Sequence, residues 1–258
     1  MKKWSDVWVN QSGRALFTDH IEYGDAQTIK NFVLRQQAED GSPNVWPQIF
    51  EIGLVYPDTI KVIQVNVNSR ITEIKEAIGL QKPISVIYNY NGYGYGVFPI
   101  DPNNLDKTPE IKDEVARAYS YINAYENTLT GKITAVKAFD VFVKGIAVEQ
   151  NELIVKLLSN QLSSIFWDFL TIKQQVVAQA ELEQLLFNKL QTELPSNIKK
   201  TIFGLFESIA YSKTGKEKLY QIWNKEITIS NLKLNEDDYI NMAMELAIFK
   251  HQKLDEIL

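Results

Sequence analysis

Residues 90–98 have the sequence YNGYGYGVF, and a polar run, DPNN, follows at residues 101–104. Before this stretch, apolar and polar residues alternate with a period of two, which is typical of half-buried strands. After it, apolar residues recur every three or four positions, as they do on one face of a helix. The stretch therefore separates a β-rich part of the chain from a helical part.

The β-rich part covers residues 28–98. Alternation is clearest at residues 50–56 and 61–67, and the Gly- and Pro-containing segments 41–44 and 56–58 supply turns between strands. Four or five strands separated by such turns favour an antiparallel sandwich, because a parallel sheet needs a crossover helix between strands. Within this part, only residues 72–80 have the composition of a short helix.

The helical part begins with the clearest amphipathic pattern in the chain. Its predicted buried stripe has spacings of three and four residues and consists of Ile111, Val115, Ala118, Ile122, Tyr125 and Leu129. A second, wider stripe spans residues 153–169. Further helices are expected at residues 135–147, 173–191, 197–211 and 216–224, and from residue 236 onward. Their short polar connections favour antiparallel neighbours. The predicted fold class is therefore a multidomain α+β protein, with a small antiparallel β-sandwich followed by an all-α, solenoid-like domain of the HEAT/armadillo kind.

Composition limits the classes of function. The 258 residues are 45% hydrophobic and 23% charged, with a net charge of −5 and no cysteine. This composition is typical of a folded globular protein. The charge offers no positive field for nucleic acid, and the longest apolar-rich run is too short for a membrane span of about 20 residues. The absence of cysteine excludes thiolate ligands and a Cys nucleophile but does not choose a compartment. The first eight residues lack the apolar core of a signal peptide, so we expect a protein that is not exported or a chain that starts inside a longer one.

Two motifs resemble a known family. Arg117-Ala118, residues 123–125 and Gly131 are similar to the R-A-x-x-x-D-D-A-F pattern and helix-ending glycine that open the helical C-terminal domain of zinc aminopeptidases of the aminopeptidase N type. Gly94-Tyr95 with Asp101 resembles that family's G-Y-Y-R-V-N-Y-D, the last strand of its small sandwich.

The sequence departs from the family pattern at several positions. Val97 stands where the family has Arg, and Ile122 and Asn123 stand where it has paired acids. In the family, a tryptophan-bearing helix ends the catalytic domain, and a Gly-x-Pro segment leads from it into the sandwich. The segment with Trp4 and Trp8 resembles that helix, but Ala15 stands where the proline would be.

The resemblance implies three parts. Residues 1–12 would be the terminal helix of a missing catalytic domain, residues 13–102 the β-sandwich domain, and residues 103–258 the α-helical C-terminal domain. Trp4 and Trp8 would then form an interdomain contact. Arg117, at the edge of the predicted stripe, is a candidate for substrate binding, although an Arg that ties its helix to a neighbour explains it as well.

The same resemblance implies a function. The chain would be the non-catalytic C-terminal part of a zinc metalloaminopeptidase, capping the active-site cavity of a hydrolase that removes N-terminal residues from peptides. His20 and His251 are the only histidines, and neither belongs to the H-E-x-x-H motif that such a metallopeptidase needs. We therefore expect no cofactor in this chain, no activity alone, and zinc in the parent enzyme's catalytic domain. The expected partners are that domain and a peptide substrate, with no nucleic acid and no membrane.

Other candidate sites have structural explanations. The tyrosines at positions 88, 90, 93 and 95 could form a stacking platform for a sugar or a base, but Asn91-Gly92 favours a hairpin whose flanking aromatics pair across strands. The acidic run at residues 235–238 is typical of a helix start. Lysines between residues 197 and 225 favour a solvated helix face over a phosphate site.

Two alternative functions remain open. One is a stand-alone binding module for carbohydrate or protein, with the helices as a scaffold. The other is an independent hydrolase with an unfamiliar site, which would need titratable groups gathered in one cleft.

Overall fold

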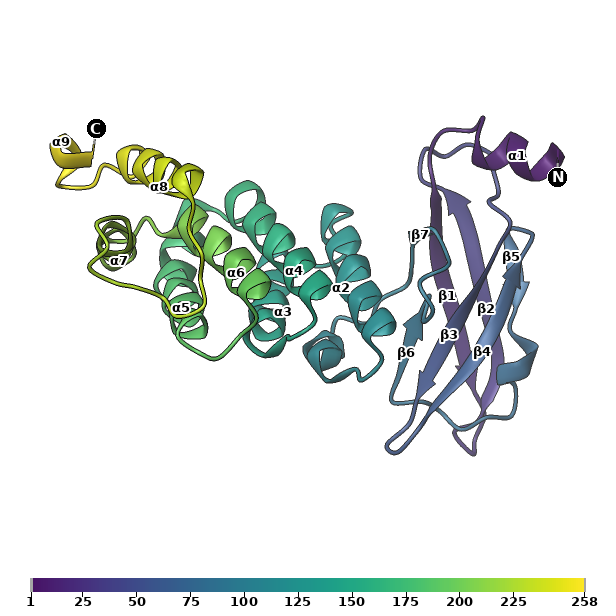
Figure 1. Cartoon of the computed structure of the whole chain (residues 1–258). Coiled ribbons are helices and arrows are strands. Elements are labelled where there is room, and N and C mark those ends of the chain that lie inside the picture. Colours follow the sequence, from purple (N-terminus) through teal and green to yellow (C-terminus); the bar gives the residue numbers. More distant parts are fainter. Residues whose placement is uncertain (1, 258) are drawn as a thin grey trace. The chain divides into compact units, whose positions relative to one another are not determined.

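The computed structural model describes residues 2–257, with side chains from Ser5 onward. It divides into two compact units, Met1–Ile133 and Thr134–Leu258. The first contains all the strands of the described chain, and the second is helical (Figure 1). The chain is thus an α+β protein, as predicted.

In the described residues of the first unit, seven strands form two sheets. One sheet has the order β5-β2-β1-β7 and the other the order β4-β3-β6. Their neighbours are antiparallel except for the short parallel pairing of β1 with β7. The strands are β1 (Ala15–Tyr23), β2 (Ile29–Ala38), β3 (Gln48–Val55), β4 (Ile60–Val67), β5 (Ile71–Glu73), β6 (Ser85–Tyr88) and β7 (Gly96–Val97).

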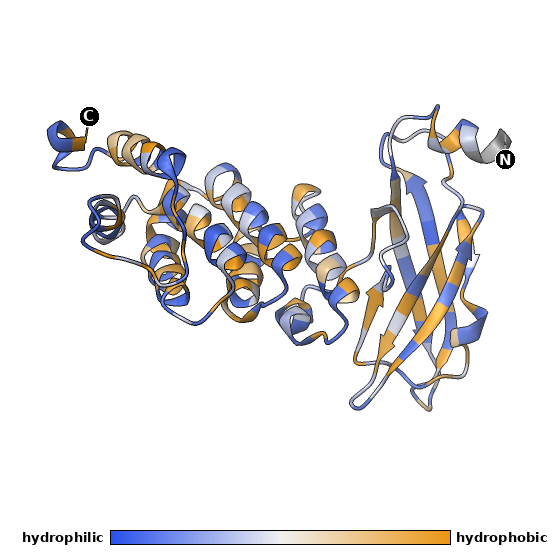
Figure 2. Cartoon of the chain, viewed as in Figure 1, coloured by the Kyte–Doolittle hydropathy of each residue, from blue (hydrophilic) through white to orange (hydrophobic). Residues whose placement is uncertain are grey.

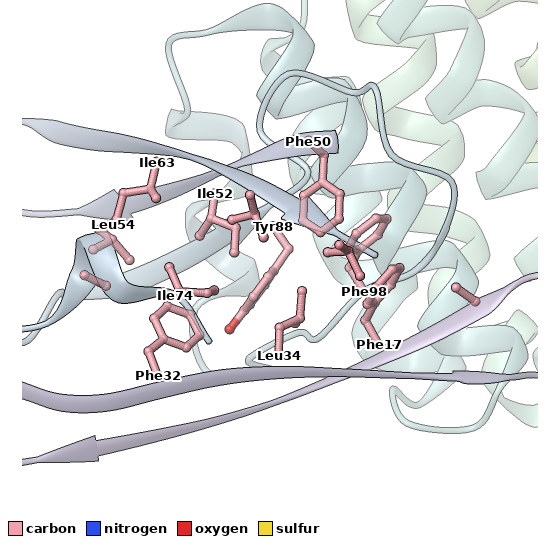
Figure 3. Packing of buried hydrophobic residues seen from close by; sticks show 14 of the residues in the cluster. Phe17, Phe32, Leu34, Phe50, Ile52, Leu54, Ile63, Ile74, Tyr88 and Phe98 are labelled. Atoms are coloured by element: carbon pink, nitrogen blue, oxygen red, sulfur yellow. The ribbon is translucent and has the colours of Figure 1, made fainter. Parts of the chain in front are cut away.

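The core of the first unit lies between these two sheets (Figure 3). Alternate residues of β2 and β3, including Phe32, Leu34, Phe50 and Ile52, are almost fully buried. Figure 2 shows the same alternation of hydrophobic and hydrophilic residues along the strands. Phe17 stacks on Phe98 with ring centroids 4.7 Å apart. The period-two pattern therefore predicted the inner face of the sandwich correctly.

The described part of the first unit also contains four helical segments: α1 (Lys2–Trp8), the 3-10 helices η1 (Lys75–Ala77) and η2 (Leu105–Glu110), and α2 (Glu114–Leu129). Helix α2 starts at Asp113, whose side chain accepts a hydrogen bond from Ala116 N. The predicted stripe of α2 is wrong. Val115 and Leu129 are 53% and 45% exposed, whereas Asn123, Ala124 and Asn127 are buried. The buried face of α2 combines Tyr121 with small and polar residues, and its asparagines bind the backbone of the sandwich.

The second unit consists of α3 (Ala135–Val148), α4 (Glu152–Ser164), the π-helix η3 (Ile165–Phe169), α5 (Ile172–Leu190), α6 (Ser196–Ile209), α7 (Lys213–Trp223), α8 (Glu236–Ile248) and α9 (Leu254–Ile257). Helix α4 packs against α3 and α6, and α5 packs against α6 and α7. The predicted helices match these to within a few residues, except that the last one is interrupted between α8 and α9. Among the described residues, no helix has the length and apolarity needed to cross a bilayer.

Candidate ligand-binding cavity

The turn after β6 is held by one buried amide. Asn89 has a positive φ of 55°; its Oδ1 accepts from Gly94 N at 2.7 Å, and its Nδ2 donates to Gly94 O at 2.8 Å. The predicted hairpin at Asn91-Gly92 is wrong, because β6 pairs with β3 whereas β7 pairs with β1. The turn instead carries the chain from one sheet to the other.

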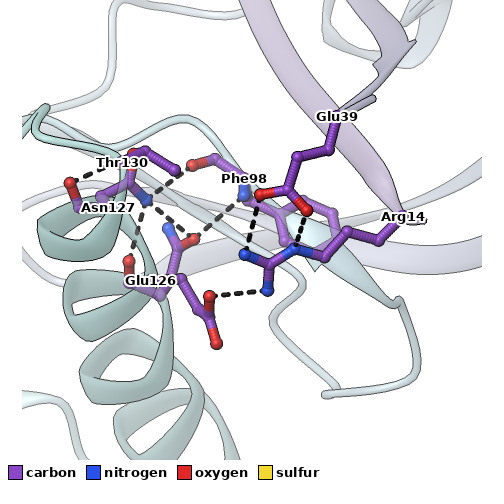
Figure 4. Close-up of polar contacts among 7 residues, drawn as sticks. Arg14, Glu39, Phe98, Glu126, Asn127 and Thr130 are labelled. Atoms are coloured by element: carbon purple, nitrogen blue, oxygen red, sulfur yellow. Dashed lines mark hydrogen bonds and ion pairs between the residues drawn. The ribbon is translucent and has the colours of Figure 1, made fainter. Parts of the chain in front are cut away.

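Two asparagines of α2 bind the strand end that follows this turn. Asn123 Oδ1 accepts from Phe98 N at 3.0 Å, and its Nδ2 donates to Pro99 O at 3.2 Å. One turn further on, Asn127 Nδ2 donates to Phe98 O at 3.1 Å (Figure 4). The backbone groups that another strand would satisfy are therefore satisfied by a helix.

An arginine adds a charged tie between the same elements. Arg14 Nε lies 2.9 Å from Glu39 Oε2, and its Nη1 lies 2.6 Å from Glu126 Oε2 on α2 (Figure 4). The hydrogen bonds that Arg14 donates to the carboxylates of Glu39 and Glu126 raise the pKa of Arg14 above its ordinary value, against the opposing effect of burial. Together with Asn123 and Asn127, this ion-pair network fixes α2 on the sandwich.

The fixed helix leaves a cavity of about 700 Å³ within the first unit. One wall is β6 with the preceding residue Ile84, and the turn between β3 and β4 continues it. Residues of the segment between Pro99 and Asp113 also line the cavity, as do Ser120 and Asn123 of α2. The volume falls within the range of about 300–1,000 Å³ that is usual for ligand pockets.

The charges around this cavity are mainly negative. Carboxylates outnumber ammonium groups among the lining side chains, which include Asp58, Asp101, Glu110, Asp113, Lys107 and Lys112. The pKa of Tyr90, which also lines the cavity, is raised by burial and then by the nearby carboxylates of Asp113 and Glu51. A cation would therefore be favoured at this site over an anion.

Arg117 does not line the cavity. Its Nη1 donates to Ile111 O at 2.7 Å and to Lys112 O at 3.3 Å. Arg117 therefore holds the segment that leads into its own helix. Its predicted role in substrate binding stays a prediction.

Trp8 packs on the sandwich. Its Nε1 donates to Pro47 O at 3.1 Å, and its ring meets Tyr95 edge-on with centroids 6.2 Å apart. The side chain of Trp4 lies outside the described residues. The interdomain contact assigned to Trp4 and Trp8 stays a prediction, although the described contacts of Trp8 are with its own unit.

The four tyrosines do not form one platform. Tyr88 is buried between the sheets, where its hydroxyl donates to Asp19 Oδ2 at 2.7 Å. Tyr90 lines the cavity, whereas Tyr93 and Tyr95 are exposed elsewhere on the turn. Tyr56 and Tyr90 line the cavity and are partly exposed, whereas Tyr88 lines it as a residue that is almost fully buried.

The histidines lie in different units. His20 is exposed beside Glu22, and His251 is buried with its ring stacked on Tyr220 at 4.7 Å. In the described part of the chain, no three His, Cys, Asp or Glu side chains are grouped as metal ligands.

The acidic run at residues 235–238 forms the predicted cap. The side chain of Asn235 and that of Asp238 complete a capping box at the start of α8. Several of the lysines in residues 197–225 also have structural partners. Lys199 donates to Ser230 O at 2.5 Å, and Lys218 lies 4.1 Å from the ring centroid of Phe187.

No protein-family model matches this chain, and no curated protein matches it closely. The resemblance to zinc aminopeptidases therefore stays a prediction.

No pattern in the sequence directly indicated the cavity or the hydrogen bonds by which Asn123 and Asn127 hold α2 on the sandwich. The spacing of Asn123 and Asn127, four residues apart, places two amides on one helical face. That spacing is the one available signal, and the stronger apolar periodicity of the same helix obscured it.

Proposed function

We propose that this chain is a non-catalytic accessory part of a zinc metalloaminopeptidase of the aminopeptidase N type, acting beside a separate catalytic domain and limiting which peptides reach it. The observation that carries the proposal is the contact of α2 with the end of the last strand of the sandwich. The motif residues between Arg117 and Gly131 lie in the helix that receives the sandwich's last strand through Asn123 and Asn127. The resemblance assigns these residues to the helix that follows the sandwich, and this likeness supports the proposal.

We also propose that α3 to α8 form a solenoid-like stack. The support is that α4 packs on α3 and α6, and that α5 packs on α6. Short segments connect the successive helices from α3 to α6. Such a stack offers a broad surface of side chains without catalytic groups. A domain of this kind can restrict access to an active site by closing over it.

The experiment uses a zinc-containing aminopeptidase catalytic domain from the source of this chain. Turnover of an amino-acid amide and of a peptide of about 20 residues is measured with the catalytic domain, with this chain, and with the mixture, together with the zinc content of each. We expect no turnover by this chain alone and a changed ratio of long to short substrate turnover in the mixture. Stoichiometric zinc with turnover by this chain alone would overturn the proposal, as would an unchanged ratio at saturating concentrations.

The cavity favours a second candidate function, a stand-alone binding module. Tyr56 and Tyr90 offer ring surfaces beside carboxylates and amides, a combination that suits a carbohydrate or a peptide. Equilibrium binding of this chain alone to a ligand panel tests this alternative, and failure to bind any member would leave the accessory role as the stronger proposal.

A further inference from the structure

We propose that the cavity beside β6 binds an extended, basic peptide segment of a partner protein, which adds as a strand to the free edge of β6. The inference rests on the binding-module alternative and does not depend on the aminopeptidase proposal.

Strand β6 lies at one edge of its sheet. The order β4-β3-β6 gives it β3 as its sheet neighbour on one side, and within the described residues no strand follows on the other. The cavity runs along β6, since all four of its residues line the space. An edge strand exposes a row of backbone donors and acceptors that an extended chain can pair with.

The pairing of β3 shows which groups of β6 face the cavity side. Tyr56 N donates to Thr59 O at 2.8 Å, so even-numbered residues of this strand direct their hydrogen bonds to β4 and odd-numbered ones to β6. Gly53 is opposite Ile87 in the register, and these two residues therefore bond to each other. By alternation, Val86 and Tyr88 direct their N–H and C=O groups to the free edge.

The dimensions fit a short peptide. Four residues of β6 extend about 13 Å at the usual rise per residue. A peptide segment of about four residues could pair along this length. The cavity also has apolar walls from Ile84, Ile87, Ile100 and Ile111, which could receive alternate side chains of an extended peptide.

The charge favours a basic peptide. Glu110 and Asp58 are exposed acids at the cavity, and Asp113 is close enough to Tyr90 to help raise the pKa of its hydroxyl. A lysine or arginine of the peptide could lie among these carboxylates and over an aromatic ring. A neutral oligosaccharide would contact the tyrosine rings but would gain nothing from the carboxylate charges. Binding experiments can therefore distinguish it from a basic peptide.

The first test measures binding of an acetylated, amidated hexapeptide of alternating valine and lysine to the whole chain by calorimetry. Two further peptides carry N-methyl groups on one or the other set of alternate amides, and a fourth replaces lysine by glutamate. We expect one N-methylated peptide to bind as the parent does and the other to lose at least about tenfold in affinity, because strand addition uses alternate donors. Equal binding of both N-methylated peptides, or tighter binding of the glutamate peptide, would overturn the proposal.

Protein variants and hydrogen exchange give independent evidence. Glu110→Lys should weaken binding of the lysine peptide about tenfold at low salt. The matched control Glu76→Lys makes the same charge change at an exposed position of η1 and should leave affinity unchanged. Peptide binding should also slow amide exchange at Val86 and Tyr88. Binding without that protection, or binding of neutral oligosaccharides in place of the peptide, would refute strand addition. These results leave the turnover experiment on the accessory role unaffected, so the two proposals can fail separately.

Discussion

Glu207 on α6 offers the sharpest test of the energetics in the second unit. Its Oε1 is buried and has no hydrogen-bond partner among the described residues. Burial, followed by the charges of Glu245 and Asp238 on α8, raises its pKa to about 7, and Lys200 on α6 opposes the rise only in part. Glu245 also has a raised pKa because it is buried. The contact between these helices thus favours the protonated carboxyl.

The direction of the pH effect follows from linkage. Between the ordinary glutamate pKa of 4.5 and about 7, the folded protein keeps a proton on Glu207 that the unfolded chain has lost. The free energy of unfolding therefore falls as pH rises through this window and is constant above it. The full pKa difference corresponds to about 3 kcal/mol. Because the side chain is partly exposed, solvent screening reduces the expected effect to about 1–2 kcal/mol.

The substitution Glu207→Gln removes the ionisation. We expect it to raise the free energy of unfolding by about 1–2 kcal/mol at pH 8 and to change it little at pH 4. Urea denaturation followed by circular dichroism at several pH values measures this difference. Glu193→Gln, at an exposed position, is the matched control and should show no such window. Equal stability of wild type and Glu207→Gln at pH 8 would refute the reasoning.

Two further predictions concern the first unit, and both are measured by urea denaturation. Asn127→Ala removes the donor to Phe98 O and should lower the free energy of unfolding by about 1–3 kcal/mol, because a buried carbonyl loses its partner. The exposed control Asn103→Ala should lower it little. Equal losses for the two variants would contradict the stabilising role of the Asn127 hydrogen bond. Trp8→Ala should lower the free energy of unfolding by about 1–2 kcal/mol, because packing and the hydrogen bond to Pro47 are lost. The exposed control Val9→Ala should change it almost not at all. A negligible loss for Trp8→Ala would instead favour the predicted interdomain contact.

Strands and helix starts were predictable where short-range rules dominate. Alternation at residues 61–67 predicted the buried face of β4, since a half-buried strand follows a period of two. The helix start at Asn235 was predictable because its cap involves only residues up to three positions apart.

The candidate site was not predictable in the same way. The sequence favoured an apolar buried face for α2, but in the structure Asn123 and Asn127 take that face because they satisfy backbone groups 24 to 29 positions away in the chain. The Asn91-Gly92 turn likewise has hairpin chemistry, yet long-range pairing of β6 and β7 with different strands decides where it leads. Local propensity cannot register contacts that depend on the sheet being assembled.

The hydrogen bonds of Asn123 and Asn127 affect how well the chain tolerates changes of length before α2. Asn123, Asn127 and the ion pair Arg14–Glu126 hold α2 at its middle and end, in addition to the hydrogen bonds that join its first turn to the segment before it. Insertions among the exposed residues 101–103 would therefore cost little, since loop-closure entropy changes slowly with length, whereas the buried side chains of Leu105 and Thr108 restrict changes within η2. Because Asp101 in this exposed segment also lines the cavity, variation there would alter ligand preference while leaving the scaffold in place.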